Sequence, residues 1–230
     1  VYLDLLYKIK RIVRRILPGR IVFLNINPLL SKKIAFQKGY AGSEIFENLV
    51  SAHSQTQFSD TEFERDGVIC QHPDYDFYIL VQIYNLFETQ DNVTVLDIGG
   101  GMASKYYQNK KYLKTLNGLK WITVEQQHIV NFCRKNIDDK NLLFFTLDEV
   151  IESQISSDLL LISSTLQYLE KPYSVFSDLL SSNPKKIIID KTPFIDEQND
   201  KQMIQKLPKE IYRAQYICWF FSDKKFKEFF

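Results

Sequence analysis

The sequence predicts an α/β fold in which helices cover both faces of a mostly parallel, doubly wound sheet. Short apolar segments of strand length alternate with helical patterns between residues 93 and 190, and this alternation is typical of βαβ units. The first of these segments ends in an aspartate followed by three glycines, which suits a tight turn from a strand into a helix. Apolar residues form 45% of the chain, which supports a packed core.

The predicted elements follow one another at short intervals. Apolar side chains that repeat at three and four positions predict a helix over residues 74–89. Proline favours the first turn of a helix, so Pro172 predicts where another helix begins. The remaining predictions are strands at residues 93–98, 120–125, 142–146, 158–163 and 186–190, and helices at residues 103–116, 126–136 and 147–154.

Two regions are predicted along the chain. Residues 1–73 form an N-terminal extension with helical pieces, and residues 74–230 form the α/β domain. The first twenty residues hold six lysines and arginines against Asp4 alone, with apolar residues at helical spacing among them. Such a basic amphipathic helix over residues 1–17 either lies on an anionic membrane surface or packs on the domain with its charges solvated.

Composition excludes several classes of protein. The net charge of +1 gives no general signature of nucleic-acid binding, and no apolar run approaches the roughly 18 residues of a membrane span. Three cysteines and three histidines are widely spaced: Cys70, Cys133, Cys218, His53, His72 and His128. This spacing indicates neither a disulfide framework nor a metal site. We therefore expect a cytoplasmic protein, peripheral at the inner face of the membrane if its first helix binds there.

The glycine run indicates the kind of ligand. Asp97 precedes Gly99, Gly100 and Gly101 at the end of the first predicted strand. Ligands of open parallel sheets bind beyond the carboxyl ends of the strands, where glycines allow the backbone to approach closely. A carboxylate at Asp97 would repel a pyrophosphate but suits a ligand with a cationic amino-acid end. This favours S-adenosylmethionine over NAD as the cofactor.

Glu125 ends the second predicted strand, 24 residues after Gly101. An acidic side chain at this place can accept hydrogen bonds from both hydroxyls of a ribose. The alternative is a solvated carboxylate at a strand end, without a ligand. Together with Asp97 and the glycines, the position favours the ribose.

The motif VLDIGGG, followed by a glutamate at a later strand end, resembles the first two motifs of class I S-adenosylmethionine-dependent methyltransferases. Several segments are similar to a methyltransferase family found beside bacterial surface-polysaccharide biosynthesis genes. These segments are FERDG (63–67), VLDIGGGMASKYYQN (95–109), WITVEQ (121–126), SSTLQYLEKPY (163–173), IIIDKTPF (187–194) and PKEIYRAQY (208–216). The resemblance covers about residues 63–225. It implies a Rossmann-like fold and methyl transfer to a hydroxyl of a glycan or nucleotide-sugar intermediate.

Two departures accompany this resemblance. Ala103 stands where many members of the superfamily have a third spaced glycine, so the turn is expected to differ. The chain also ends before the last two strands of the usual seven-stranded sheet are complete, so we expect these C-terminal strands to be missing.

The resemblance also implies roles for single residues. Asp97 and the glycines would shape the methionine end of the cofactor pocket, and Glu125 would bind the ribose. Further cofactor contacts are implied for Gln126, Leu147, Asp148, Ser163 and Ser164. For Asp148 the alternative is a cap of the following helix, and for the two serines it is capping of the strand-end backbone.

A hydroxyl acceptor also needs a base to take its proton. The candidates for this catalytic role are Asp190, His72 and Asp66, with His128 as a further one. Asp190 ends the fifth predicted strand and therefore lies on the ligand side of the sheet. The candidates for substrate binding are Arg65, Tyr168, Tyr212 and Tyr216.

Two of these assignments have simple structural alternatives. Arg65 could hold a phosphate or carboxylate of the acceptor, or form a local ion pair with Asp66. His128 could be a surface residue. For the whole chain, the alternatives are a non-catalytic Rossmann-like scaffold and a NAD-dependent oxidoreductase.

Overall fold

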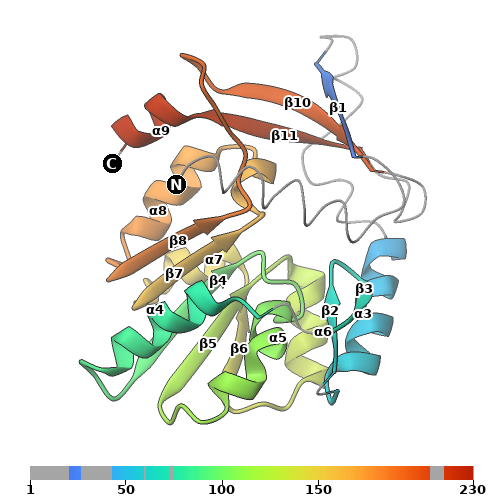
Figure 1. Ribbon diagram of the computed structural model, residues 1–230, viewed down its shortest axis with the longest axis vertical. Coiled ribbons are helices and arrows are strands. Elements are labelled where there is room, and N and C mark those ends of the chain that lie inside the picture. The colour runs from blue at the N-terminus through green and yellow to red at the C-terminus, as the bar shows by residue number, and fades with distance from the viewer. Residues whose placement is uncertain (1–20, 27–42, 60, 73–74, 208–214, 230) are drawn as a thin grey trace. The chain divides into compact units, whose positions relative to one another are not determined.

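The structure is a computed structural model that describes residues 21–26, 43–59, 61–72, 75–207 and 215–229 (Figure 1). Contacts within the chain form two compact units, and their boundaries differ from the division at residue 73 drawn from the sequence. The first unit, here the parallel-sheet unit, comprises Ile45–Thr165 and Lys171–Asp190. The second, here the mixed-sheet unit, comprises Val1–Glu44, Leu166–Glu170 and Lys191–Phe230.

The parallel-sheet unit contains five strands in the order β6-β5-β4-β7-β8, all of them paired in parallel. The strands are β4 (Val93–Ile98), β5 (Leu119–Val124), β6 (Leu142–Phe145), β7 (Leu159–Ser163) and β8 (Lys186–Asp190). The chain runs outward from β4 to β6 and then returns to β7 on the other side of β4. The predicted doubly wound α/β fold is confirmed, and β4 and β7 flank its switch point.

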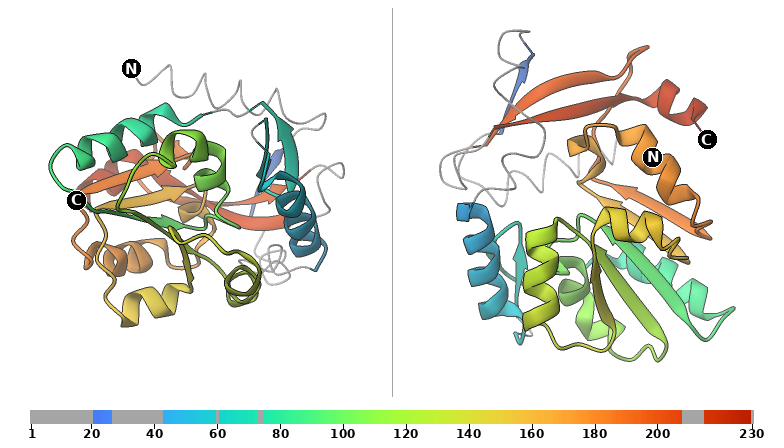
Figure 2. Two further views of the ribbon diagram at one scale, coloured as in Figure 1. Left: turned by 90° about the horizontal axis from the view of Figure 1, so that it is seen from below. Right: turned by 180° about the vertical axis from the view of Figure 1, so that it is seen from behind.

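Helices cover both faces of this sheet (Figure 2). They are α4 (Phe77–Phe87), α5 (Ser104–Leu113), α6 (Gln127–Asn136), α7 (Leu147–Glu152) and α8 (Pro172–Leu180). The central strands are therefore buried on both sides, and four successive residues of β7, Leu159 to Ile162, have no exposed surface. As predicted, Pro172 occupies the first turn of α8.

The same unit begins with a helix and a two-stranded hairpin. Helix α3 (Ser43–Thr56) precedes an antiparallel hairpin of β2 (Glu62–Arg65) and β3 (Val68–Gln71). Asp66 and Gly67 form the turn, with φ angles of 54° and 76°. Two central residues with positive φ are the mark of a type I′ turn, which favours Asp-Gly. Helix α3 agrees with the helical pieces expected in residues 1–73, whereas the hairpin was not predicted.

The mixed-sheet unit holds a second sheet, in the order β1-β10-β11-β9. Its strands are β1 (Val22–Asn25), β9 (Phe194–Ile195), β10 (Lys201–Lys206) and β11 (Gln215–Ser222), with the 3₁₀ turn η1 (Leu166–Tyr168) and helix α9 (Asp223–Glu228) in the same unit. Strand β11 pairs antiparallel with β10 and parallel with β9. We expected the last two strands of a seven-stranded sheet to be missing; in the described residues the parallel sheet has five strands, and the three strands after residue 190 pair in the mixed sheet instead.

The predicted basic helix over residues 1–17 lies outside the described residues. In the part of the chain that is described, no helix has the length and apolarity needed to cross a bilayer. The three cysteines are free thiols, of which Cys133 and Cys218 are buried.

Candidate functional site

The candidate site lies where β4 turns into α5, at the carboxyl edge of the parallel sheet. The backbone turns sharply here, because Gly99 and Gly101 have φ angles of 72° and 62°. The Gly99 amide donates to the Val124 carbonyl oxygen at 2.8 Å, which ties the loop to the neighbouring strand β5. Ala103 adopts the left-handed conformation too, with φ 65°, which is unusual for a residue with a side chain.

Two of the three glycines have no room for a side chain. A Cβ atom on Gly99 would collide with the side chain of Thr165, and one on Gly100 would collide with the carboxylate of Asp97. Thr165 cannot easily withdraw, because its hydroxyl donates to the Ile98 carbonyl oxygen at 2.9 Å. The loop backbone therefore lies directly against Asp97, as expected of a loop that a ligand approaches closely.

Asp97 is a buried carboxyl group with 1% of its surface exposed. Its Oδ2 accepts a hydrogen bond from the indole Nε1 of Trp121 at 3.2 Å. Burial raises the pKa of Asp97 to about 7, although the nearby Lys105 ammonium and the Trp121 hydrogen bond act against that rise. A buried acid with a pKa near neutrality is typical of functional sites.

Glu125 follows β5 and contacts the glycine loop from the other side. Its Oε1 accepts the Gly101 amide at 3.0 Å, and its Oε2 accepts the Gln126 amide at 2.9 Å. Burial raises the pKa of this carboxyl group. Each carboxylate oxygen has a second acceptor position, so Glu125 can hold the loop and still accept hydrogen bonds from a ligand.

Sequence reasoning missed a buried lysine at this edge. The Lys105 side chain is 11% exposed, and its ammonium contacts Asp76 and lies 3.7 Å from Asp190 Oδ2. Asn109 fixes this arrangement, because it accepts the Asp76 amide at 3.1 Å and donates to the Lys105 carbonyl oxygen at 2.9 Å. A cation in the first turn of a helix opposes the helix dipole, and that anomaly was the one signal available in the sequence.

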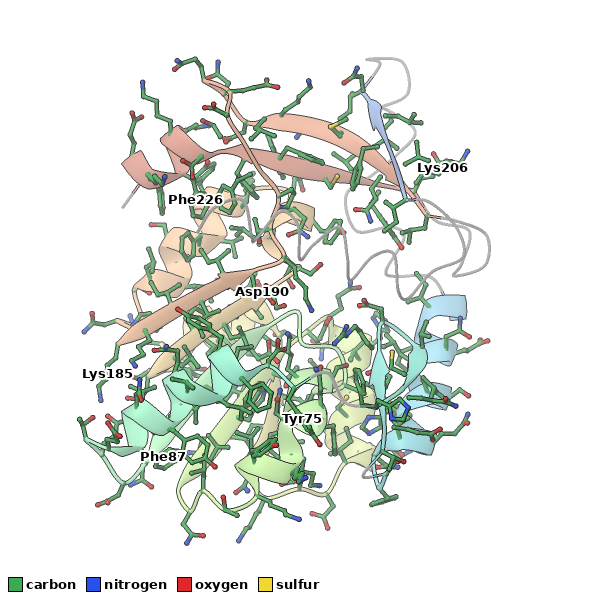
Figure 3. The ribbon with its side chains drawn as sticks, viewed as in Figure 1. Tyr75, Phe87, Lys185, Asp190, Lys206 and Phe226 are labelled. Carbon is green, nitrogen blue, oxygen red and sulfur yellow. The ribbon has the colours of Figure 1, made fainter. Side chains whose placement is uncertain are left out.

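Asp190 ends β8, where Figure 3 labels it. Its Oδ2 accepts the Ser163 hydroxyl at 3.1 Å, and its carbonyl oxygen accepts the Ser164 amide at 2.9 Å. The Asp190 side chain is 37% exposed, so a partner outside the protein can reach it. The structure thus brings the ends of β7 and β8 together as the topology predicted.

Residues predicted to contact an adenine occupy the starts of two helices. Gln126 is the N-cap of α6. Asp148 is an exposed residue in the first turn of α7, and the cap of that helix is Thr146, whose side chain accepts the Glu149 amide at 3.2 Å. The capping alternative for Asp148 is therefore wrong, while its contact with an adenine stays a prediction.

The His128 ring, a further candidate for the base, is half-buried. It packs edge-on against Phe46, with 5.1 Å between the ring centres.

The hairpin carries the remaining catalytic candidates, Asp66 and His72. Asp66 lies at the exposed tip of the turn, and His72 is exposed just after β3 with φ 74°. The Arg65 guanidinium donates to Gln108 Oε1 at 3.3 Å rather than forming the local ion pair with Asp66 considered above.

The predicted tyrosines belong to the mixed-sheet unit. Tyr168 donates its hydroxyl to Gln205 Oε1 at 2.8 Å and packs edge-on against the buried Tyr216, with 5.9 Å between ring centres. Tyr212 lies outside the described residues. Within the described residues, no group of three His, Cys, Asp or Glu side chains is placed to hold a metal ion.

No model of a known protein family matches the chain, and no curated protein matches it. Among solved structures, the chain is similar to the N-terminal domain of EvdMO1 in the presence of SAH and D-fucose, with 12% identity, coverage of 82% of this chain and 87% of that one, and a TM-score of 0.48.

The chain is also similar to two further solved structures, again at low sequence identity. The plantazolicin methyltransferase BpumL in complex with SAH is 15% identical, with 70% of this chain and 58% of that one covered and a TM-score of 0.45. The [4+2]-cyclase SpnF is 14% identical, with 64% and 56% covered and a TM-score of 0.40. Similarity at this level identifies neither a family nor a reaction for this chain.

Proposed function

We propose that this protein is an S-adenosylmethionine-dependent methyltransferase whose cofactor binds at the carboxyl ends of β4 and β5. One observation carries the proposal. A buried Asp97 carboxyl group lies directly against Gly100, where no side chain fits, and Glu125 from the next strand is hydrogen-bonded to the same loop.

The residues fit this cofactor in charge and in hydrogen-bonding capacity. Asp97, with a pKa of about 7, would ionise beside the cationic amino-acid end of the ligand. Glu125 keeps free acceptor positions for the ribose hydroxyls. Gln126 and Asp148 would contact the adenine, and Ser163 and Ser164 would lie near the reacting centre.

The same features argue against a nicotinamide dinucleotide. Pyrophosphate is anionic, and a glycine loop that binds it offers free backbone amides at a helix N-terminus. In this chain the Gly101 amide already donates to Glu125 at 3.0 Å, and the side chain nearest to Gly100, that of Asp97, is acidic. Both features disfavour a doubly charged anion at this loop.

When bound, S-adenosylmethionine supplies a methyl group on a positively charged sulfur. The protein then has to align the acceptor with that methyl group and exclude water. We propose Asp190 as the base that takes the proton of the acceptor hydroxyl. It is accessible at a strand end, and the Ser163 hydroxyl and the Lys105 ammonium hold its Oδ2 from two sides. His72 and Asp66 stay as alternative bases on the hairpin.

For the acceptor, we propose a hydroxyl of a glycan or nucleotide-sugar intermediate in bacterial surface-polysaccharide biosynthesis. The sequence resemblance supports this assignment. Arg65 would bind an anionic group of such an acceptor. The Tyr216 ring, with 1% of its surface exposed, is too buried to stack on a sugar. A basic helix over residues 1–17 would hold this cytoplasmic enzyme near lipid-linked acceptors at the inner face of the membrane.

The test is calorimetric titration with S-adenosylhomocysteine, the product form of the cofactor, with NAD as the control ligand. We expect stoichiometric binding of S-adenosylhomocysteine, no binding of NAD, and loss of binding in Asp97→Ala and Glu125→Ala variants that stay folded. Glu152→Ala, an exposed position on α7, is the matched control. Binding of NAD alone would select the oxidoreductase.

Catalysis is tested separately, with radiolabelled S-adenosylmethionine and a panel of nucleotide sugars and glycan extracts. Label transfer that requires Asp190 supports the proposal. Cofactor binding without transfer to any extract would favour the non-catalytic scaffold.

A further inference from the structure

We infer that the β2–β3 hairpin is part of the cofactor site, and that Glu64 is a positioning residue that holds the glycine loop through Ser104. The inference rests on the proposed function for the identity of the ligand. It assigns a role to the FERDG segment, which neither the glycine loop nor the base accounts for.

Glu64 is a buried carboxylate, with 3% of its surface exposed. A buried charge is costly unless hydrogen bonds satisfy it, and here both oxygens are used. Glu64 Oε1 accepts the Gly67 amide at 2.7 Å, and Glu64 Oε2 accepts the Ser104 hydroxyl. The carboxylate therefore joins the hairpin turn to the first residue of α5.

Ser104 in turn contacts the glycine loop. Its amide donates to the Gly100 carbonyl oxygen at 3.1 Å. Its Oγ lies 3.4 Å from the place that a Cβ on Gly101 would occupy, so the hydroxyl packs against the loop itself. From the β5 side, Glu125 holds the Gly101 amide at 3.0 Å. The loop is thus held by two carboxyl groups, the buried Glu64 from the hairpin and the half-buried Glu125 from the end of β5.

A second contact aligns the hairpin with the helix. Arg65, the residue after Glu64, donates to Gln108 at 3.3 Å, and Gln108 lies one helical turn beyond Ser104. Adjacent hairpin residues therefore bind successive turns of α5. Two contacts along one helix face fix the orientation of the hairpin, which a single hydrogen bond would leave free to rotate.

The turn chemistry makes the Glu64 contact possible. Gly67 has φ 76°, and a Cβ there would lie 3.2 Å from Asn48 Cβ on α3. Glycine adopts this positive φ angle without strain and has no side chain to meet Asn48, so its amide can donate to Glu64. The hairpin then preorganises the glycine loop before the cofactor binds, which lowers the entropic cost of binding.

The experiment is a double-mutant cycle on the affinity for S-adenosylhomocysteine, measured by calorimetry. Glu64→Leu and Ser104→Ala should each weaken binding about tenfold, as expected from losing one hydrogen bond to a charged group. The double variant should bind no more weakly than the weaker single variant. Ser104→Thr and Glu64→Gln keep the hydrogen bond and should restore most of the affinity.

Glu62→Leu makes the same chemical change as Glu64→Leu two residues earlier on β2 and is the control. Additive effects of Glu64→Leu and Ser104→Ala, or unchanged affinity in both, would overturn the inference while binding by the wild type upholds the proposed function.

A second measurement needs no ligand. Amide hydrogen exchange of the free protein should be about tenfold faster at Gly101 and Ser104 in Glu64→Leu, and unchanged in Glu62→Leu. If the wild type binds no S-adenosylhomocysteine, the proposed function fails, and this exchange result alone decides whether Glu64 holds the loop.

Discussion

The indole N–H of Trp121 points at the carboxylate of Asp97 from the neighbouring strand, with 3.2 Å between Nε1 and Oδ2. Asp97 is in register with Thr123, so Trp121 lies two residues earlier on the same face of β5. The same Oδ2 atom is the nearest neighbour of a Cβ placed on Gly100. A fully buried tryptophan therefore determines where the carboxylate lies beneath the glycine loop.

This contact predicts the effect of Trp121→Phe, which keeps an aromatic ring and removes the donor. We expect the dissociation constant for S-adenosylhomocysteine to rise about tenfold and stability to fall by about 1.5–3 kcal/mol, because a hydrogen bond to a charged group is lost. Calorimetric titration and urea unfolding measure the two effects. Lower stability with unchanged affinity would mean that Trp121 serves packing alone.

Gly100→Ala and Gly101→Ala form a matched pair within the loop. A methyl group at Gly100 meets Asp97 and Thr123, so we expect destabilisation of about 1–3 kcal/mol and loss of cofactor binding. At Gly101 the methyl group has space beside Ser104, and the cost is about 1 kcal/mol for the left-handed conformation. Equal losses of affinity in the two variants would contradict this account of the loop.

Cofactor binding should release protons near neutral pH. Asp97 has a pKa of about 7 in the free protein, and a bound ammonium group would lower it. Titration in buffers with different ionisation enthalpies measures the released protons. We expect close to one proton at about pH 6, few at about pH 8, and none at either pH from Asp97→Asn. Equal proton release by the wild type and the variant would show that another group responds to the ligand.

Stability should depend on pH through the same group. The folded pKa of Asp97 is raised from 3.8 to about 7, so its stabilising contribution is complete below the unfolded pKa and is lost as the pH rises toward 7. Asp97→Asn lacks this titration. The difference in free energy of unfolding between wild type and variant should therefore change between about pH 4 and pH 7 and stay constant above, as measured by urea unfolding. A constant difference throughout would refute the raised pKa.

The assignment of the base is tested by three single substitutions. Asp190→Asn should lower methyl transfer about a hundredfold or more while S-adenosylhomocysteine still binds. Asp66→Asn should change neither transfer nor melting temperature, since Asn-Gly also forms a type I′ turn. His72→Gln should likewise keep its activity. A large loss in Asp66→Asn or His72→Gln, with activity retained in Asp190→Asn, would move the role to the hairpin.

Sequence patterns predicted the parallel sheet well, because each of its strands is a short apolar run between polar or glycine-containing breaks. The hairpin was missed although Asp66-Gly67 is a strong turn signal. Its strands are only four residues long, too short for a clear periodicity: β2 has three charged residues and one phenylalanine, and β3 has three apolar residues and a glutamine. In the mixed sheet, the pairing of β1 with β10 joins segments far apart in the chain, and β10 mixes polar with apolar side chains.

The residues of the candidate site were also predicted only in part. Asp97, the glycines and Glu125 were found because their roles follow from position along a strand and its turn. Glu64, Asp76 and Lys105 were not found, because a charged residue in a polar stretch is expected to be solvated. Their burial is decided by which segments the tertiary structure brings over them, and a single sequence has no local pattern for that.

The pairing of β1 with β10 has a consequence for the order of folding. Val22 pairs with Lys206 and Asn25 with Met203, so the two partners are separated by about 180 residues, whereas the strands of the parallel sheet pair over far shorter separations. On the ribosome, the parallel sheet can close before β10 has been synthesised. Strand β1, which includes the exposed Phe23, stays unpaired until β10 has been synthesised, and until then it offers an open edge to other nascent chains.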